Sequence, residues 1–241
     1  MTSGNPGRPG RAPDLPDRVS PTAVISRSAL RLNLRAVLST QPDAAIDVRA
    51  DGWGHGLGFV AQTALESGVR ALIVDEEGRR ELDGVVPAAV LVSGSPSAIG
   101  DPVYGLSAGF IPVLSLRGRV LSLKELKTGE AVSYGYTFRT PRDTVIALVT
   151  GGYAQGVLRA LGNAVTVRIA GERHPIVGRV AMDVCVVDVG PRPRVRRGDE
   201  VTFFDESPEG PAVAEWAAAG GLTPAEIACA VGLRNHREYV A

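Results

Sequence analysis

Lysine is a scarce side chain in this sequence. The 241 residues include 26 basic ones, but only Lys124 and Lys127 carry a side-chain primary amine. Such an amine can form a Schiff base with a carbonyl group, and this linkage holds several cofactors and substrates covalently. Schiff-base chemistry could therefore begin at only these two side chains. Their acidic neighbours Glu125 and Glu130 favour an exposed strand face over a cofactor site.

A second group of polar side chains lies in the glycine-rich segment 48–56, VRADGWGHG. Arg49 keeps its proton at any physiological pH, so its guanidinium can pair with a carboxylate or bind an anion but cannot serve as a Schiff-base amine. We expect Arg49 to pair with Asp47 or Asp51, and anion binding is the alternative. His55 stands between two glycines, and we expect it to cap the following helix or to face solvent.

Short motifs surround three further candidate residues: Tyr134 in VSYG, Tyr153 in GYAQG and Met182 in GRVAMD. Taken alone, a strand tyrosine is more often packed with its hydroxyl at the surface, and a methionine is more often part of the core. Cys185 and Cys229 both lie in apolar surroundings. Two thiols form neither a disulfide framework nor a metal site, and they are typical of a cytoplasmic protein.

The charge balance argues against nucleic-acid and membrane partners. Lys and Arg together number 26, as do Asp and Glu, and no basic run is interleaved with aromatic residues. No apolar stretch is long enough to span a bilayer. The first residues lack the apolar centre of a signal peptide, and their Pro, Gly and Arg content predicts a disordered tail over residues 1–21. We therefore expect a cytoplasmic protein.

The amino-terminal part alternates between helical and strand patterns. A helix with Ser28 as N-cap is expected first, followed by a glycine-rich turn after the first strand. The expected helices cover residues 28–39, 59–68 and 77–82, and the expected strands cover 44–48, 71–76 and 88–94, with a further short apolar segment, DPVYGL, at 101–106. This alternation with short links predicts parallel α/β units.

From residue 111 onward, strands follow one another without helices between them. The alternation at Val165, Val167 and Ile169 has the period of a half-buried strand, and AGER after it predicts a hairpin turn. Two helices are expected at the end, over residues 211–221 and 223–232. The second has Thr223, Pro224 and Glu226 in the arrangement of a capping box. We therefore expect an antiparallel β domain over residues 111–241 that folds by itself.

Four motifs occur here in the order in which alanine racemases carry them. The family segment VKADAYGHG corresponds to VRADGWGHG, and the family motifs VSYG, GYADG and GRICMD correspond to VSYG at 132–135, GYAQG at 152–156 and GRVAMD at 178–183. The chain thus resembles the alanine racemases, fold-type III pyridoxal-phosphate enzymes. The resemblance implies an α+β fold, in which a β-barrel-like alanine-racemase C-terminal domain is joined to a truncated (β/α) barrel remnant over residues 22–106.

The resemblance also implies roles for individual residues. In the family, a lysine holds pyridoxal phosphate as a Schiff base on one face of the substrate, and a tyrosine from the partner subunit works on the other face. Carried over to this chain, the catalytic tyrosine is Tyr134, and Met182 and Asp183 would bind the substrate carboxylate. Tyr153 would line the route into the site.

The chain departs from the family at the cofactor. Arg49 stands at the lysine position, and Trp53 replaces a tyrosine whose hydroxyl helps to hold the phosphate, so these two cofactor-binding positions have lost the family's chemistry. No covalent cofactor is expected, and pyridoxal phosphate is implied by the resemblance only.

The chain is also too short for a whole barrel. A (β/α)₈ barrel needs roughly 250 residues, and only residues 22–106 precede the β domain. The middle of the barrel is missing, between about Gly94 and Asp101, and DPVYGL corresponds to the last barrel strand. Because the eighth strand of a barrel lies beside the first, the remaining strands should form an open sheet in the order 8-1-2-3 with two free edges.

We conclude from the sequence that this is an alanine-racemase-like protein but not an independent racemase. It could be a partner or regulator of a complete racemase, as a homo-oligomer or heteromer, because the family builds each site across a dimer. Two alternatives remain: an active pyridoxal-phosphate isomerase that supplies D-alanine, and an anion- or small-molecule-binding protein that uses the residual cleft.

Overall fold

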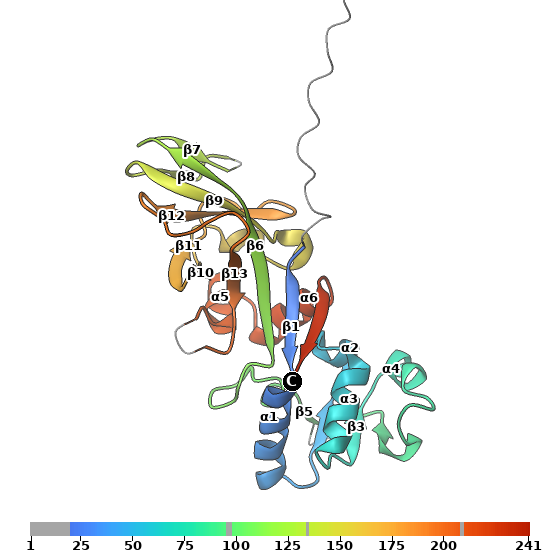
Figure 1. The fold of residues 1–241 in the computed structure, drawn as a ribbon. Coiled ribbons are helices and arrows are strands. Elements are labelled where there is room, and N and C mark those ends of the chain that lie inside the picture. The colour runs from blue at the N-terminus through green and yellow to red at the C-terminus, as the bar shows by residue number, and fades with distance from the viewer. Residues whose placement is uncertain (1–19, 95–97, 134, 208–209) are drawn as a thin grey trace, which may run out of the picture.

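A computed structural model describes residues 20–94, 98–133, 135–207 and 210–241. In Figure 1 the chain forms two parts, a small α/β part below and a larger, mostly β part above it. The predicted disordered tail lies almost wholly outside the described residues, and so does Tyr134.

The small part contains a parallel four-stranded sheet. Its strands are β2 (Ala45–Asp47), β3 (Ala71–Ile73), β4 (Leu91–Val92) and β5 (Ala98–Ile99), in the order β4-β3-β2-β5. This confirms the predicted order 8-1-2-3, with β4 and β5 as edges that pair on one side only among the described strands. The position predicted for the last strand is wrong, however. That strand is β5, and DPVYGL at 101–106 forms turns and contains the buried Tyr104.

Helices α1 (Arg27–Thr40) and α3 (Leu57–Glu66) pack against this sheet, while α2 (Arg49–Trp53) directly follows β2 and α4 (Glu76–Glu81) follows β3. The apolar side chains of α1 and α3 pack with Ile46 and Leu72 of the sheet in one core. The N-cap of α1 is Ser26 and not Ser28, because the Ser26 hydroxyl accepts from the Ala29 N–H at 3.2 Å. A 3-10 helix over Ala88–Val90 leads into β4.

The large part is built on an eight-stranded sheet. Its strands are β1 (Thr22–Ser26), β6 (Leu114–Leu126), β9 (Thr144–Thr150), β10 (Thr166–Ile169), β11 (Glu172–Pro175), β12 (Val184–Gly190), β13 (Glu200–Phe204) and β14 (His236–Val240). The order is β11-β10-β13-β6-β1-β14, with β9 joining β6 to β12. A separate pair, β7 (Ala131–Val132) and β8 (Phe138–Arg139), and 3-10 helices over Tyr153–Gln155 and Arg159–Leu161 complete this part.

Two strands of the large sheet are absent from the sequence-based expectation. β1 lies between β6, to which it is antiparallel, and β14, to which it is parallel. Residues 22–26 had been grouped with the barrel remnant, but by hydrogen bonding they belong to the large sheet. Their partners follow about 90 and about 210 residues later in the sequence, and no local pattern indicates such pairing.

Two helices pack against the large sheet and close the fold. They are α5 (Val213–Gly220) and α6 (Pro224–Gly232), and Trp216 of α5 is fully buried against Phe203 and Phe204. The predicted capping box of α6 is confirmed, since the Thr223 hydroxyl accepts from the Glu226 N–H at 3.2 Å and the Glu226 carboxylate accepts from the Thr223 N–H at 2.7 Å.

Candidate functional site

The segment that follows β2 makes a left-handed turn. The five residues 50–54 all have positive φ, from 49° at Ala50 to 79° at Gly54. Left-handed backbone costs roughly 1–2 kcal/mol for each residue that is not glycine, so such a run must be held by its surroundings. The Asp51 carboxylate supplies part of this support, because it accepts from the Leu57 N–H at 2.7 Å and forms an ion pair with Arg237 of β14.

Arg49 begins this segment and is bound to the end of β2. Its Nε and Nη2 atoms donate to the Asp47 carboxylate at 2.9 Å and 2.5 Å. Burial raises the pKa of Asp47, but the hydrogen bonds and positive charge of Arg49 outweigh it, so the net pKa is lowered. Of the partners expected for Arg49, the structure therefore shows Asp47, while Asp51 pairs with Arg237.

The prediction for His55 is wrong, because the imidazole is fully buried. Its Nδ1–H donates to the carbonyl oxygens of Gly52 and Trp53 at 3.1 Å and 3.0 Å, and its ring stacks on Tyr104 with 4.6 Å between centroids. Burial lowers the pKa of His55 to about 4, so the side chain is neutral at physiological pH. Asp51 provides the cap of α3 that had been assigned to His55.

Trp53 also stacks on Tyr104, with 5.2 Å between ring centroids. The Tyr104 hydroxyl donates to the Asp47 carbonyl oxygen at 2.8 Å, which ties this aromatic group to the end of β2. Trp53 also borders a hollow of about 360 Å³, together with Gln41, Asp47 and residues 98–102. Tyr104 could not be identified from the sequence, because DPVYGL has a strand pattern and carries no sign of an aromatic stack.

A second group of candidates lies on the large part of the fold. The turn that contains Met182 and Asp183 is bound to the loop after β9, because Gly151 N–H donates to the Asp183 carbonyl oxygen and Ala154 N–H to that of Met182, both at 3.0 Å. The Asp183 carboxylate accepts from the Gln155 amide at 3.1 Å. The Met182 side chain is 55% exposed and that of Tyr153 38% exposed. The backbone of this turn is therefore fixed, while both side chains face outward.

Ser133, the residue before Tyr134, is anchored to a neighbouring loop. The Ser133 hydroxyl donates to the Arg179 carbonyl oxygen at 2.5 Å, and both Ser133 and Gly135 have positive φ. A groove of about 500 Å³ runs beside them, lined by Tyr136, Arg179 and apolar residues of β9 and β12. Ser133 is thus held in place beside an open groove.

The described residues do not bring these two groups together. No described hydrogen bond or ion pair joins the Arg49 segment to Met182 and Asp183. Helix α6 lies between the two loops, since Gly54 packs against Ala228 and Cys229 while Gly156 packs against Ala230 and Val231. The two groups of candidate residues therefore lie on different parts of the chain, with α6 between them.

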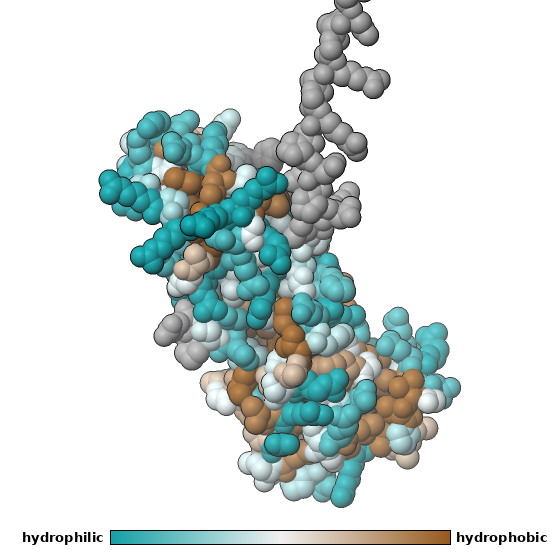
Figure 2. Space-filling model, viewed as in Figure 1, coloured by the Kyte–Doolittle hydropathy of each residue, from teal (hydrophilic) through white to brown (hydrophobic). Residues whose placement is uncertain are grey.

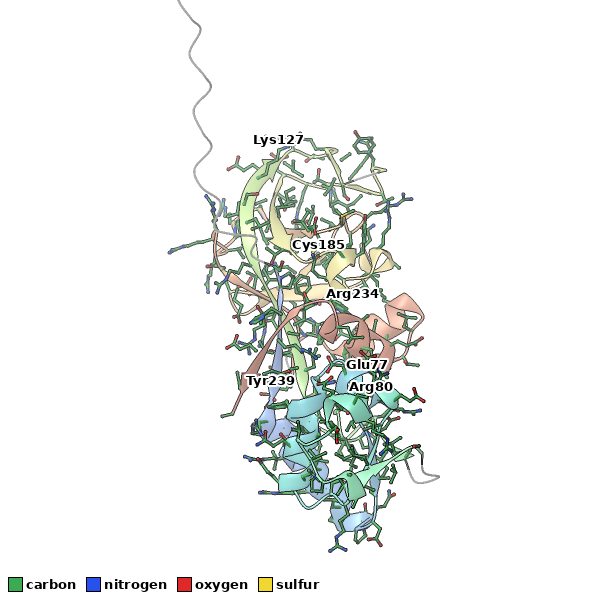
Figure 3. All side chains as sticks on the ribbon, turned by 90° about the vertical axis from the view of Figure 1, so that its right-hand side faces the viewer. Glu77, Arg80, Lys127, Cys185, Arg234 and Tyr239 are labelled. Atoms are coloured by element: carbon green, nitrogen blue, oxygen red, sulfur yellow. The ribbon has the colours of Figure 1, made fainter. Side chains whose placement is uncertain are left out.

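The residues present do not fit a covalently held pyridoxal phosphate. Arg49 offers no reactive amine and is occupied by Asp47. Lys127 pairs with Asp143 at 2.9 Å at the far end of the molecule from the small part, as Figure 3 shows, and Lys124 is exposed on β6 three residues earlier. Neither amine can reach the carboxyl end of β2.

Other candidate chemistry is limited in the described part of the chain. Both cysteines are free thiols, and burial raises the pKa of each. Within residues 20–94, 98–133, 135–207 and 210–241 there is no cluster of His, Cys, Asp or Glu suited to a metal ion. None of the described helices has the length and apolar character needed to cross a bilayer.

Solved structures define the class to which this fold belongs. The fold is similar to that of alanine racemase from the D-cycloserine producing Streptomyces lavendulae, with a TM-score of 0.84 and 20% identity, covering 95% of this chain and 98% of that chain. Alanine racemase from Bartonella henselae, solved with covalently bound pyridoxal phosphate, gives a TM-score of 0.80 and 19% identity over 92% and 99% of the two chains. The protein has the alanine racemase fold.

The sequence defines the family. The model of the family described as alanine racemase, C-terminal domain, matches residues 113–239, and the chain belongs to this family. Alanine racemase from Mycobacterium avium is 40% identical over 149 residues, which are 58% of this chain and 38% of that protein. Alanine racemase from Treponema pallidum is 35% identical over 165 residues, 67% and 43% of the two. The chain spans about two fifths of the length of these relatives.

Proposed function

We propose that this protein does not racemise alanine by itself and instead associates with a complete alanine racemase. The observation that carries the proposal is the ion pair between Arg49 and Asp47, at the position where the family resemblance implies a cofactor lysine. A guanidinium that is permanently protonated and already paired cannot supply a Schiff-base amine. The chain therefore lacks the group on which the implied reaction depends.

The surface of the small part supports association with another chain. Edge strands β4 and β5 each pair on one side only among the described strands, and unpaired edges favour pairing with other chains. In Figure 2 apolar surface gathers over α4 and the segment after it, where the Val85 side chain is 67% exposed. Burial of this surface against a partner would stabilise the small part.

The large part of the fold supports the proposal that the partner is a complete racemase. Met182 and Asp183 lie in a turn with a fixed backbone, and Ser133, which directly precedes Tyr134 in the sequence, is bound to Arg179. This is the half of a racemase site that, by family resemblance, one subunit presents to the other. We propose that Tyr134 is presented to the cofactor site of the complete racemase and exchanges a proton there through its phenol.

Co-expression with a complete racemase from the same cell tests this function. We expect the two proteins to co-purify, and the racemase activity of the complex to differ between wild type and Tyr134→Phe. Tyr136→Phe is the matched control, because this tyrosine lies two residues away and is 69% exposed. Separate elution of the two proteins would contradict the proposal, as would a confirmed complex in which Tyr134→Phe changes nothing.

The structure favours this function over the two alternatives from the sequence. Binding of an anion at Arg49 is disfavoured, because its positive charge and the N–H groups at Nε and Nη2 are already paired with the Asp47 carboxylate. Independent racemisation would require an amine at the end of β2. Alanine racemisation by the isolated chain would restore that second alternative.

A further inference from the structure

The carboxyl ends of β2 and β5 are where a barrel protein would bind its ligand, because barrel sites lie at the carboxyl ends of the parallel strands. In this chain the indole of Trp53 lies there. A Cβ atom added to Gly100, directly after β5, would overlap Cζ2 and Cη2 of the indole. Its ring thus lies against the backbone at the end of the sheet, and Tyr104 stacks on it.

The backbone keeps the indole in this place. Trp53 has a φ of 53°, which is rare for a bulky residue, and it follows three other left-handed residues. The turn is fixed by the bond from Leu57 N–H to Asp51, and by Gly54, which packs closely against Ala228 and Cys229 of α6. The indole could leave the cleft only by a change of side-chain rotamer, which would end its contact with Tyr104 and Gly100.

We infer that Trp53 is a specificity-determining residue that closes this cleft to planar ring ligands such as pyridoxal phosphate. The inference rests on the proposed function and adds to it a second obstacle to binding of pyridoxal phosphate, independent of Arg49. A ring entering over β5 must occupy the volume of the indole and take its place on Tyr104. Restoring an amine at position 49 is therefore insufficient, because the indole still occupies the place over β5 and against Tyr104.

Four proteins test the inference: Arg49→Lys, Trp53→Tyr, the double variant with both changes, and Arg49→Lys combined with Trp216→Phe. Each is incubated with pyridoxal phosphate, reduced with borohydride and analysed by peptide mass. A lysine amine and the aldehyde lose water to form the imine, and borohydride reduces it to a stable amine on residue 49. Trp216→Phe controls for general loosening, because Trp216 is buried in the large part of the fold.

We expect at least about tenfold more adduct on residue 49 in the Arg49→Lys, Trp53→Tyr double variant than in Arg49→Lys alone, a difference of about 1.4 kcal/mol in binding. The Trp216→Phe combination should label as weakly as Arg49→Lys. A second measurement uses Trp53→Tyr with Arg49 intact, whose melting temperature should rise on addition of pyridoxal phosphate while that of wild type does not.

Equal labelling of residue 49 with and without the Trp53 change would overturn the inference. An equal increase in labelling when Arg49→Lys is combined with Trp216→Phe would overturn it as well. An unchanged melting temperature of Trp53→Tyr would also count against it. These outcomes leave the proposed function intact. That function fails on a different result, namely alanine racemisation by the unmodified chain.

Discussion

Arg49 and His55 stand six residues apart, and they differ in how far the sequence predicts their surroundings. Asp47 lies two residues before Arg49 at the end of a strand, so a local pair could be expected, and the structure contains it. His55 is buried by Tyr104, which lies 49 residues later and stacks on the imidazole. A local pattern of two flanking glycines carries no information about such a contact.

The buried imidazole predicts a loss of stability in acid. His55 has a pKa of about 4 in the folded chain against 6.5 for a free histidine. Below pH 6.5 the unfolded chain gains a proton that the folded chain cannot take up, so stability is complete above pH 6.5 and falls as the pH drops toward 4. The shift corresponds to at most about 3 kcal/mol.

Urea denaturation between pH 4 and pH 7 measures this effect. His55→Phe keeps a ring on Tyr104 but cannot be protonated, so its free energy of unfolding should depend less on pH than that of wild type. His236→Gln is the control, since His236 is exposed on β14 and its replacement should leave the wild-type slope. Parallel pH profiles for wild type and His55→Phe would show that His55 is not the responsible group.

At the scale of elements, the structure confirms those that have strong local signals. Thr223, Pro224 and Glu226 mark the start of α6, and the order of the four short strands in the small part followed from the geometry of a barrel. The long strand β6 was expected as strand, but its pairing with β1, β9 and β13 could not be predicted. Sequence pattern specifies which residues alternate, whereas the partner of a strand depends on contacts distant in sequence.

Helix α6 connects the two parts of the chain through glycines. A Cβ atom on Gly232 would overlap the carbonyl oxygen of Gly54 in the left-handed turn. Gly232→Ala should therefore lower the free energy of unfolding by about 1–3 kcal/mol, in the range of overpacked sites. Gly58→Ala in α3 is the matched control, because nothing lies within 4 Å of its added Cβ and helix propensity favours alanine by up to about 1 kcal/mol.

Thermal or urea unfolding of both variants decides the matter. A loss of stability in Gly232→Ala, together with an unchanged or higher stability in Gly58→Ala, is the expected pair of results. Equal stability of the two variants would mean that α6 does not press on the turn as the structure describes.

At the scale of the whole molecule, β1 changes the expectation for separate folding. Residues 111–241 were expected to fold alone, but β1 lies between β6 and β14 in the large sheet. Removal of residues 22–26 leaves β14 without its only described neighbour. The division of the chain into a remnant and an independent β domain therefore remains a prediction. It depends on whether residues 111–241 keep their fold without residues 22–26.

Two fragments and a peptide test this expectation. The fragment 111–241 should retain a folded core, but amides of β14 should exchange faster with solvent than in the full chain. A synthetic peptide of residues 20–27 added in excess should restore their protection. Unchanged protection of β14 in the fragment without the peptide would contradict the role assigned to β1. The fragment 22–106 has free sheet edges and should give no cooperative melt.

We propose that no amine of this chain alone can act on alanine. The purified protein is incubated with pyridoxal phosphate and L-alanine in D₂O. Proton NMR then reports directly on the replacement of the alanine Cα hydrogen by deuterium. We predict no loss of the Cα signal beyond that seen with pyridoxal phosphate and no protein. Faster exchange that requires the folded chain, and that is abolished when Lys124 and Lys127 are both replaced by arginine, would contradict the account.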